Sequence, residues 1–285
     1  MKLVVGYEAT PQGIDALALA NSLAELLHAQ LDIVVVLRRN DIFSMEYPPT
    51  GGIDDIVTAH ACRWLKGALE QVNNGIEARG RIVAARSTSQ GLIRAAEEAE
   101  ASMIVVGGAS TSPLKRHQLG SVATDLLYSS PVPVALAPRG YYSTPITRLN
   151  CAVGTRPGAG SLVREGIVLA EHANKPLRLV ALLDGDSAAA SRAAEENTQA
   201  ILAAAQQELG VAAAVDIAVG QSTEVNDAIS HVGFDAGDIL FVGSSRVEQK
   251  HRVFLGSLAM RILRVLTVPL VVVPRGYVAR REVKD

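Results

Sequence analysis

The sequence predicts an α/β protein made of two tandem domains, each a mostly parallel sheet flanked by helices. Three observations predict it: the length of the chain, an internal repeat, and the alternation of aliphatic with helix-like segments. The chain has 285 residues, whereas one domain usually takes about 100–200. Hydrophobic residues make up 48% and aromatic residues only 4%. The cores must therefore be aliphatic, as in strands covered by helices on both faces.

The repeat is clearest near the end of each half. Residues 103–141 align without a gap with residues 239–277, and 14 of the 39 positions are identical. The first strands also match, since Val4-Val5-Gly6 resembles Ala152-Val153-Gly154 at an offset of 148 residues. We therefore expect the second copy to be 12 residues shorter, with the missing part in the irregular stretch of the first copy around 38–56. A period of this length indicates a duplicated domain.

Each half alternates strand with helix and ends in a strand. In the first half we expect strands at 3–6, 31–37, 81–85, 103–106 and 132–137, and helices at 14–28, 56–72, 90–100 and 121–129. In the second half we expect strands at 151–154, 177–183, 215–219, 239–242 and 270–273, and helices at 161–173, 188–209, 224–232 and 257–265. This alternation predicts a parallel sheet with right-handed crossovers in each half. The two domains of the chain would span residues 1–141 and 150–277, with a linker at 142–149 and a tail at 278–285.

Charge and composition argue against several partners. The net charge is −2, which offers no basic surface to a nucleic acid. No apolar run reaches the roughly 18–20 residues that span a bilayer, so we expect no membrane partner and a cytoplasmic location. Cys62 and Cys151 lie far from one another and from any His cluster, so we expect neither a disulfide framework nor a metal site.

A glycine pattern that follows the fourth strand of each half could hold an anion. Gly107 ends the strand and Gly120-Ser121 opens a helix, and the same holds for Gly243 and Gly256-Ser257. Glycine lets the backbone approach a phosphate, and the free N–H groups of a helix N-terminus favour negative charge. The simpler alternative is that these glycines only make a tight strand exit and a helix start.

This segment resembles the loop G-x2-G-x9-G-[ST] of the universal stress protein family. Here the pattern has Gly107, Ser110 in place of the second glycine, and Gly120-Ser121. The second copy has Gly243, Arg246 in the second-glycine place, and Gly256-Ser257-Leu258. The resemblance covers essentially the whole chain, twice, and implies two Rossmann-like domains of the adenine nucleotide alpha hydrolase type.

The family also carries an acidic residue just past its first strand. In Val5-Gly6-Tyr7-Glu8-Ala9-Thr10-Pro11, Glu8 falls on that position, and in the second copy we align Arg156 with it. The resemblance implies an adenine-nucleotide site in the first half, with ATP or another adenine nucleotide as ligand, with or without Mg²⁺. Its residues would be Glu8 and Thr10 near the ribose or phosphates, Leu37 near the adenine, and Gly107, Gly108, Ser110, Gly120, Ser121 and Val122 around the phosphates. A weaker counterpart would use Gly243, Arg246, Gly256, Ser257 and Leu258.

The first functional hypothesis is a regulatory binding protein of the stress response that is not an enzyme. The second is an interaction scaffold that binds no nucleotide, which the departures at Ser110 and Arg246 favour. The third is a slow nucleotide hydrolase, for which the sequence offers only Glu8 as a base. The family resemblance further implies that the final strands, 132–137 and 268–273, pair antiparallel within the chain, and we expect homo-oligomers.

Overall fold

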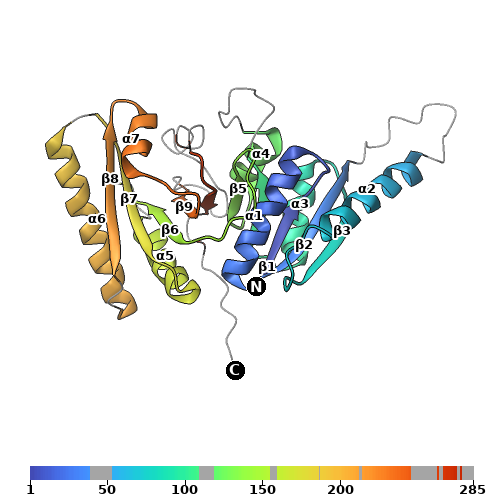
Figure 1. Ribbon diagram of the computed structural model, residues 1–285, viewed down its shortest axis with the longest axis horizontal. Coiled ribbons are helices and arrows are strands. Elements are labelled where there is room, and N and C mark those ends of the chain that lie inside the picture. The colour runs from blue at the N-terminus through green and yellow to red at the C-terminus, as the bar shows by residue number, and fades with distance from the viewer. Residues whose placement is uncertain are drawn as a thin grey trace.

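In the computed structural model of the chain, ten strands of the described residues form one continuous sheet (Figure 1). The structure describes residues 1–38, 53–108, 119–154, 159–185, 187–211, 214–244, 262, 266–274 and 277. Within these ranges, no helix combines the length and the apolar character needed to cross a bilayer.

The elements follow the predicted alternation. The first half comprises β1 (Lys2–Gly6), α1 (Pro11–Leu27), β2 (Gln30–Arg38), α2 (Ile53–Leu69), β3 (Ala78–Ala85), α3 (Thr88–Glu98), β4 (Met103–Gly107), α4 (Ser121–Ser129) and β5 (Val134–Ala137). The second half comprises β6 (Arg148–Ala152), α5 (Ala159–Ala173), β7 (Leu177–Asp184), α6 (Ala188–Leu209), β8 (Val215–Ser222), α7 (Val225–Val232), β9 (Asp238–Gly243) and β10 (Leu270–Val273). Of the helix expected at 257–265, only Ile262 lies within the described residues, and it is helical.

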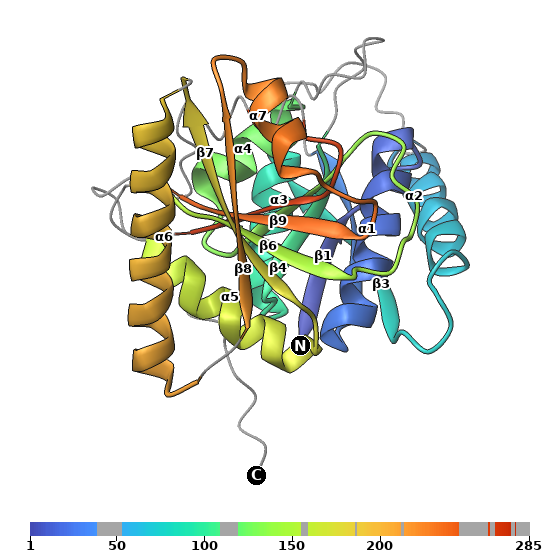
Figure 2. The same cartoon turned by 60° about the vertical axis from the view of Figure 1, so that its left-hand side comes forward.

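The strand order is β3-β2-β1-β4-β5-β10-β9-β6-β7-β8. Read outward from the centre, both halves therefore have the same order. All pairs within a half are parallel, and β5 pairs with β10 antiparallel. This confirms the predicted fold class of two mostly parallel α/β units (Figures 1 and 2).

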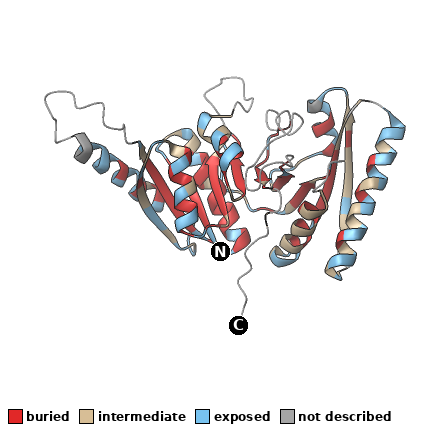
Figure 3. Cartoon of the chain, turned by 180° about the vertical axis from the view of Figure 1, so that it is seen from behind, coloured by how far each residue is buried: buried red, intermediate tan, exposed pale blue. Residues whose placement is uncertain are grey.

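Helices cover both faces of the sheet, and each face has its own apolar core that runs through both halves. Figure 3 shows the buried strands between helices whose outer surfaces are exposed. The core of one face includes Leu17 of α1, Leu65 of α2, Ile167 of α5 and Ala205 of α6. The core of the other face includes Leu92 of α3, Leu126 of α4 and Ile229 of α7.

The seam between the halves is the pairing of β5 with β10. Ala135 lies directly opposite Val271, both are fully buried, and both belong to the same core. The two positions correspond in the repeat, so the approximate two-fold axis passes between them. Pairing two copies of the first half would place Ala opposite Ala, and two copies of the second would place Val opposite Val. A small residue opposite a larger one fills this space without a cavity or a clash.

The segment that follows β5 docks on α1. The backbone N–H of Gly140 donates to Asp15 Oδ2 at 3.1 Å, and the Tyr141 hydroxyl donates to Ser22 Oγ at 3.2 Å. Burial raises the pKa of Asp15, while the backbone hydrogen bond from Gly140 lowers it in part. These contacts hold the path from β5 to β6 against the first half.

The strand registers correct the alignment of the two first strands. Leu3 pairs with Met103, and Leu149 pairs with Ile239, so β1 and β6 are offset by 146 residues (149 − 3) and not by 148. Glu8 therefore corresponds to Gly154, and the assignment of Arg156 to the acidic position was wrong. The sequence alignment matched Val5-Gly6 with Val153-Gly154, which lies two residues beyond the true counterpart. Hydrogen bonding between strands fixes the register, and the sequence alone does not show it.

β6 also begins at Arg148, within the stretch 142–149 that we expected to be linker. Its early residues are polar and therefore lacked the aliphatic pattern of a buried strand. Asn150 is fully buried. Its side-chain amide is satisfied there, because Nδ2 donates to the Ile239 carbonyl and Oδ1 accepts from Arg178 Nε at 2.6 Å.

The two halves bury opposite charges at one corresponding position. Asp32 on β2 is 2% exposed and pairs with Arg79 and Arg81 of β3. Its counterpart on β7 is Arg178, which is 8% exposed and lies 3.5 Å from the carboxylate of Asp238 on β9. Each half thus balances its buried charge with a partner from a different strand, as burial of an ion requires.

Arginine also binds the end of a helix in both halves. Arg81 donates to the Ala95 carbonyl at the end of α3, and Arg178 donates to the Val232 carbonyl at the end of α7. The pairing carboxylates, Asp32 and Asp238, hold these guanidinium groups in place. The two networks are therefore different solutions to one packing requirement.

We predict that the seam residues are energetically coupled. Ala135→Val should destabilise the chain by about 1–3 kcal/mol through overpacking, and Val271→Ala by about 2 kcal/mol through a cavity. The exchange Ala135→Val with Val271→Ala should recover at least about 1 kcal/mol of the summed loss. Urea unfolding of the four proteins measures the coupling. Strictly additive losses would mean that the two side chains do not share the space.

We predict that Asp238 makes stability depend on acidic pH. Burial raises the pKa of Asp238, but hydrogen bonds from Arg148, the Asp235 backbone and Asn150 outweigh it and lower the pKa below 3.8. The stability that it contributes is thus fully present above pH 3.8 and lost as pH falls through the lowered pKa. Asp238→Asn should destabilise the chain by about 3 kcal/mol near neutral pH and flatten the acid limb of the stability curve. An acid limb of unchanged steepness would contradict this assignment.

Candidate functional site

The candidate site lies at the carboxyl ends of β1 and β4, where the strand order of the first half reverses. The chain runs from β1 outward to β2 and β3, then returns to β4 on the other side of β1. The helices that follow β1 and β4, α1 and α4, consequently lie on opposite faces of the sheet. In open α/β sheets this arrangement forms the usual ligand crevice.

Glu8 and Thr10 form the turn between β1 and α1. Thr10 is the N-cap of α1, since its hydroxyl accepts from the Gly13 N–H at 3.3 Å. The exposed carboxylate of Glu8 makes no hydrogen bond or ion pair with any described residue. Glu8 is therefore available to a ligand, whereas the Thr10 side chain already has a structural partner.

Two glycines allow this turn to pack tightly, one within α1 and one at the end of β4. A methyl group at Gly13 would overlap the Glu8 carbonyl oxygen, and one at Gly107 would overlap the Gln12 carbonyl oxygen. Gly107 thus lets the start of α1 pack against the end of β4. The next residue, Gly108, continues the sheet by donating its N–H to Ala137 at 2.8 Å.

The N-terminus of α4 has no side-chain cap among the described residues. Gly120 is its N-cap and provides no side-chain hydrogen bond, and a methyl group there would meet no atom within 4 Å. Ser121 is exposed and Val122 half-buried in the first turn. The helix is anchored to α3 by the Ser89 hydroxyl, which donates to Asp125 Oδ2 at 3.3 Å. This end of α4 can therefore receive an anion.

Leu37 lies at the end of β2, next to β1 in the sheet. It is half-buried and packs against the core of the α1 face. The contact with adenine that we expected of Leu37 stays a prediction. The described residues thus bring Glu8, Gly107, Gly108 and Leu37 to one edge of the sheet.

Five predicted site residues lie outside the described residues, namely Ser110, Arg246, Gly256, Ser257 and Leu258. Of the second copy, the structure describes Gly243, which is exposed and whose absent methyl would meet only Leu162 Cδ2, at 3.8 Å. The equivalents of Glu8 and Gly13 are Gly154 and Ala159. Residue 154 thus carries no carboxylate, and the rest of that turn, residues 155–158, lies outside the described part of the chain.

Sequence reasoning missed two residues that shape this edge. Gln12 supplies the carbonyl against which Gly107 packs, and Asp15 binds the Gly140 N–H one turn further along α1. A carboxylate within a helix that is otherwise largely apolar could have marked Asp15 as a buried partner. The contact of Gln12 uses only backbone and leaves no trace in the residue type.

Comparisons with known proteins agree with this architecture. A family model described as "Universal stress protein family" matches residues 1–138. A universal stress protein of Mycobacterium tuberculosis H37Rv is 30% identical over 295 residues, which cover 96% of this chain and all of that protein. The crystal structure of a universal stress protein from Archaeoglobus fulgidus shares 20% identity and covers 96% of this chain and 98% of its own, with a TM-score of 0.67.

The fold extends beyond proteins with that description. The cytoplasmic domain of a prokaryotic cation chloride cotransporter superposes with a TM-score of 0.52 at 10% identity, over 98% of this chain and 97% of that one. This likeness concerns the fold alone.

We predict that Gly13→Ala destabilises the protein, although the same change usually stabilises a helix. The added methyl would overlap the Glu8 carbonyl, so we expect a loss of about 1–3 kcal/mol. Gly67→Ala in α2 is the matched control, because its methyl meets nothing within 4 Å, and it should gain about 1 kcal/mol. Thermal unfolding compares the two. A gain in both variants would show that the turn is not closely packed.

Proposed function

The chain belongs to the universal stress protein family, and from this premise we propose that it is a regulatory binding protein whose first half takes an adenine nucleotide. The observation that carries the proposal is the placement of the exposed Glu8 carboxylate, which has no partner among the described residues, at the switch point between β1 and β4. The family describes the class of protein. The nucleotide and its site are our inference.

In this proposal, different residues contact the ribose, the adenine and the phosphates of the nucleotide. Glu8 accepts hydrogen bonds from the ribose hydroxyls, and Leu37 lies under the adenine. The backbone N–H groups at Ser121 and Val122 donate to the phosphates, because the N-terminus of α4 has no side-chain cap and its dipole favours anions. Gly107 and Gly108 keep the floor of the site close to the sheet.

Such a site could supply one protein ligand to a magnesium ion. Mg²⁺ commonly takes one or two carboxylates together with phosphate oxygens and water, and Glu8 could be the protein's carboxylate. Within the described part of the chain, no group of three or more His, Cys, Asp and Glu side chains could hold a metal by itself. The ion would therefore arrive with the nucleotide and contribute charge neutralisation.

We propose binding without turnover. Hydrolysis needs a base that positions water in line with the phosphates, and Glu8 is the candidate that the described residues offer at this edge. If Glu8 binds the ribose, it is not available for that role. Partner choice that depends on the bound nucleotide would then connect the site with the stress response.

Only the first half is proposed to bind. Gly154 and Ala159 replace Glu8 and Gly13 in the second half, so the carboxylate is absent and a methyl group stands where the first half has none. One nucleotide per chain is the expected stoichiometry.

The alternative, an interaction scaffold without nucleotide, has one observation in its favour. The space that glycine leaves at Gly107 is filled by the Gln12 carbonyl, so packing alone accounts for that residue. For either function we propose homo-oligomers, for which the exposed Ile56, Val57 and Trp64 of α2 provide apolar surface.

We predict that ATP binds once per chain and that Glu8→Ala weakens it about tenfold, as expected for a hydrogen bond to a charged group. Isothermal titration of the full chain, with and without Mg²⁺, measures both affinity and stoichiometry. Gly154→Ala is the matched control at the equivalent position, where a methyl meets no atom within 4 Å, and should leave binding unchanged. Absence of heat and of thermal stabilisation by ATP, ADP and AMP would support the scaffold instead.

A further inference from the structure

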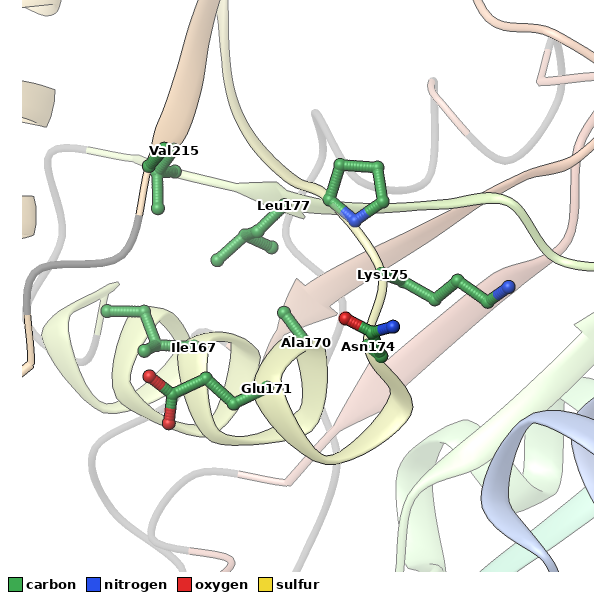
Figure 4. A pocket seen from close by; sticks show the side chains of 9 residues that line it. Ile167, Ala170, Glu171, Asn174, Lys175, Leu177 and Val215 are labelled. Carbon is green, nitrogen blue, oxygen red and sulfur yellow. The ribbon is translucent and has the colours of Figure 1, made fainter.

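A cavity opens at the amino-terminal ends of β7 and β8, whereas the candidate nucleotide site lies at the carboxyl ends of β1 and β4. Its volume is about 330 Å³, and its lining includes Ile167 and Ala170 of α5, Leu177 of β7 and Val215 of β8. Figure 4 shows these apolar side chains together, with the Glu171 carboxylate at the margin and the Lys175 side chain extending away. This pocket is remote from the carboxyl ends of the strands and is no part of the nucleotide site proposed above.

The repeat identifies the same place in the first half. Leu31 and Leu177 correspond, since they pair with Ala78 and Val215 at the start of β3 and β8. The two helices also end alike, at His28 with φ 49° and at Asn174 with φ 48°. By the offset of 146 residues, Asn21 and Glu25 of α1 stand where Ile167 and Glu171 stand in α5.

In the first half this place is occupied by the loop between α2 and β3, residues 70–77. Asn73 Nδ2 donates to Glu25 Oε1 at 2.6 Å, while Asn21 Nδ2 donates to the Gln71 carbonyl at 3.0 Å. Val72 and Ile76 pack against the core beneath. The loop therefore fills the space with aliphatic side chains next to an amide that binds a carboxylate.

In the second half the corresponding connection has five residues, 210–214, where the first half has eight. Glu171 is retained in the place of Glu25, but its exposed carboxylate has no hydrogen-bond or ion-pair partner among the described residues. Ile167 replaces Asn21, which changes the floor from polar to apolar. The pocket thus keeps the acceptor, has an apolar floor in place of a polar one, and adjoins a connection three residues shorter than that of the first half.

We propose that this pocket docks a short segment of a partner protein that presents an aliphatic side chain beside a hydrogen-bond donor. The loop 70–77 is the internal template for such an occupant, because it makes these two contacts at the equivalent place. The aliphatic side chain covers Ile167 and Leu177, and the donor binds the Glu171 carboxylate. The second half, which carries Gly154 in the place of Glu8, would in this way bind a partner while the first half binds the nucleotide.

The template itself is the probe. The full chain, labelled with ¹⁵N, is titrated with a capped peptide of residues 70–77, Glu-Gln-Val-Asn-Asn-Gly-Ile-Glu. We expect saturable shifts confined to residues 167–177, 214 and 215, with a Kd on the order of 0.1–1 mM for so small a contact. A peptide in which Val and Ile are both replaced by Ser should lose binding.

Variants of the pocket separate recognition from nonspecific contact. Glu171→Ala should weaken the peptide about tenfold, as loss of a charge-assisted hydrogen bond does. Ala214→Trp, at an exposed position of the rim, should block it without removing any packed atom. Glu196→Ala on the outer face of α6 is the matched control and should have no effect.

Three results would overturn the proposal: no saturable shifts, shifts at residues 21–31 in place of the pocket, or binding that Glu171→Ala leaves unchanged. ATP titration of the same variants keeps this test separate from the proposed nucleotide site, because Glu171→Ala and Ala214→Trp should not alter it.

Discussion

The antiparallel pairing of β5 with β10 is the contact on which the whole arrangement depends. It joins two parallel sheets of identical order into one and lets each apolar core continue from one half into the other. Ala135 faces Val271 at the centre of this seam, so the unlike halves fit each other where two like halves would leave a void or collide.

Elsewhere, too, a residue that differs between the halves is matched by a difference in the residues around it. Asp32 and Arg178 occupy one position of the fold with opposite charges. Asp32 pairs with arginines of the adjacent strand β3, whereas Arg178 lies beside Asp238 of β9, on the far side of β6. Burial allows neither charge to stand alone, so the partners must have changed with it. The two halves also differ at the carboxyl ends of their first strands and in one connection: Glu8 corresponds to Gly154, and the connection before β8 is three residues shorter than the one before β3.

Much of this could be read from residue patterns, and the failures have definite causes. Aliphatic runs predicted the strands, and the long alanine-rich helix α6 has the predicted bounds. The start of β6 was missed because Arg148 and Asn150 are polar residues whose partners lie on other strands. The glycine at 107 was interpreted as space for a phosphate, yet it admits the backbone of Gln12. A glycine indicates that something comes close, and only the fold shows what it is.

The sequence by itself determined the duplication, the fold class and the family, because these depend on local periodicity and on motifs spaced along the chain. Tertiary structure alone decided which residues of the two halves correspond, since the register of β1 and β6 is set by hydrogen bonds to strands about a hundred residues away. It also decided that Glu8 has no counterpart in the second half and that Glu171 lies at the margin of a pocket. Contacts between distant segments carry that information, and no local pattern can encode it.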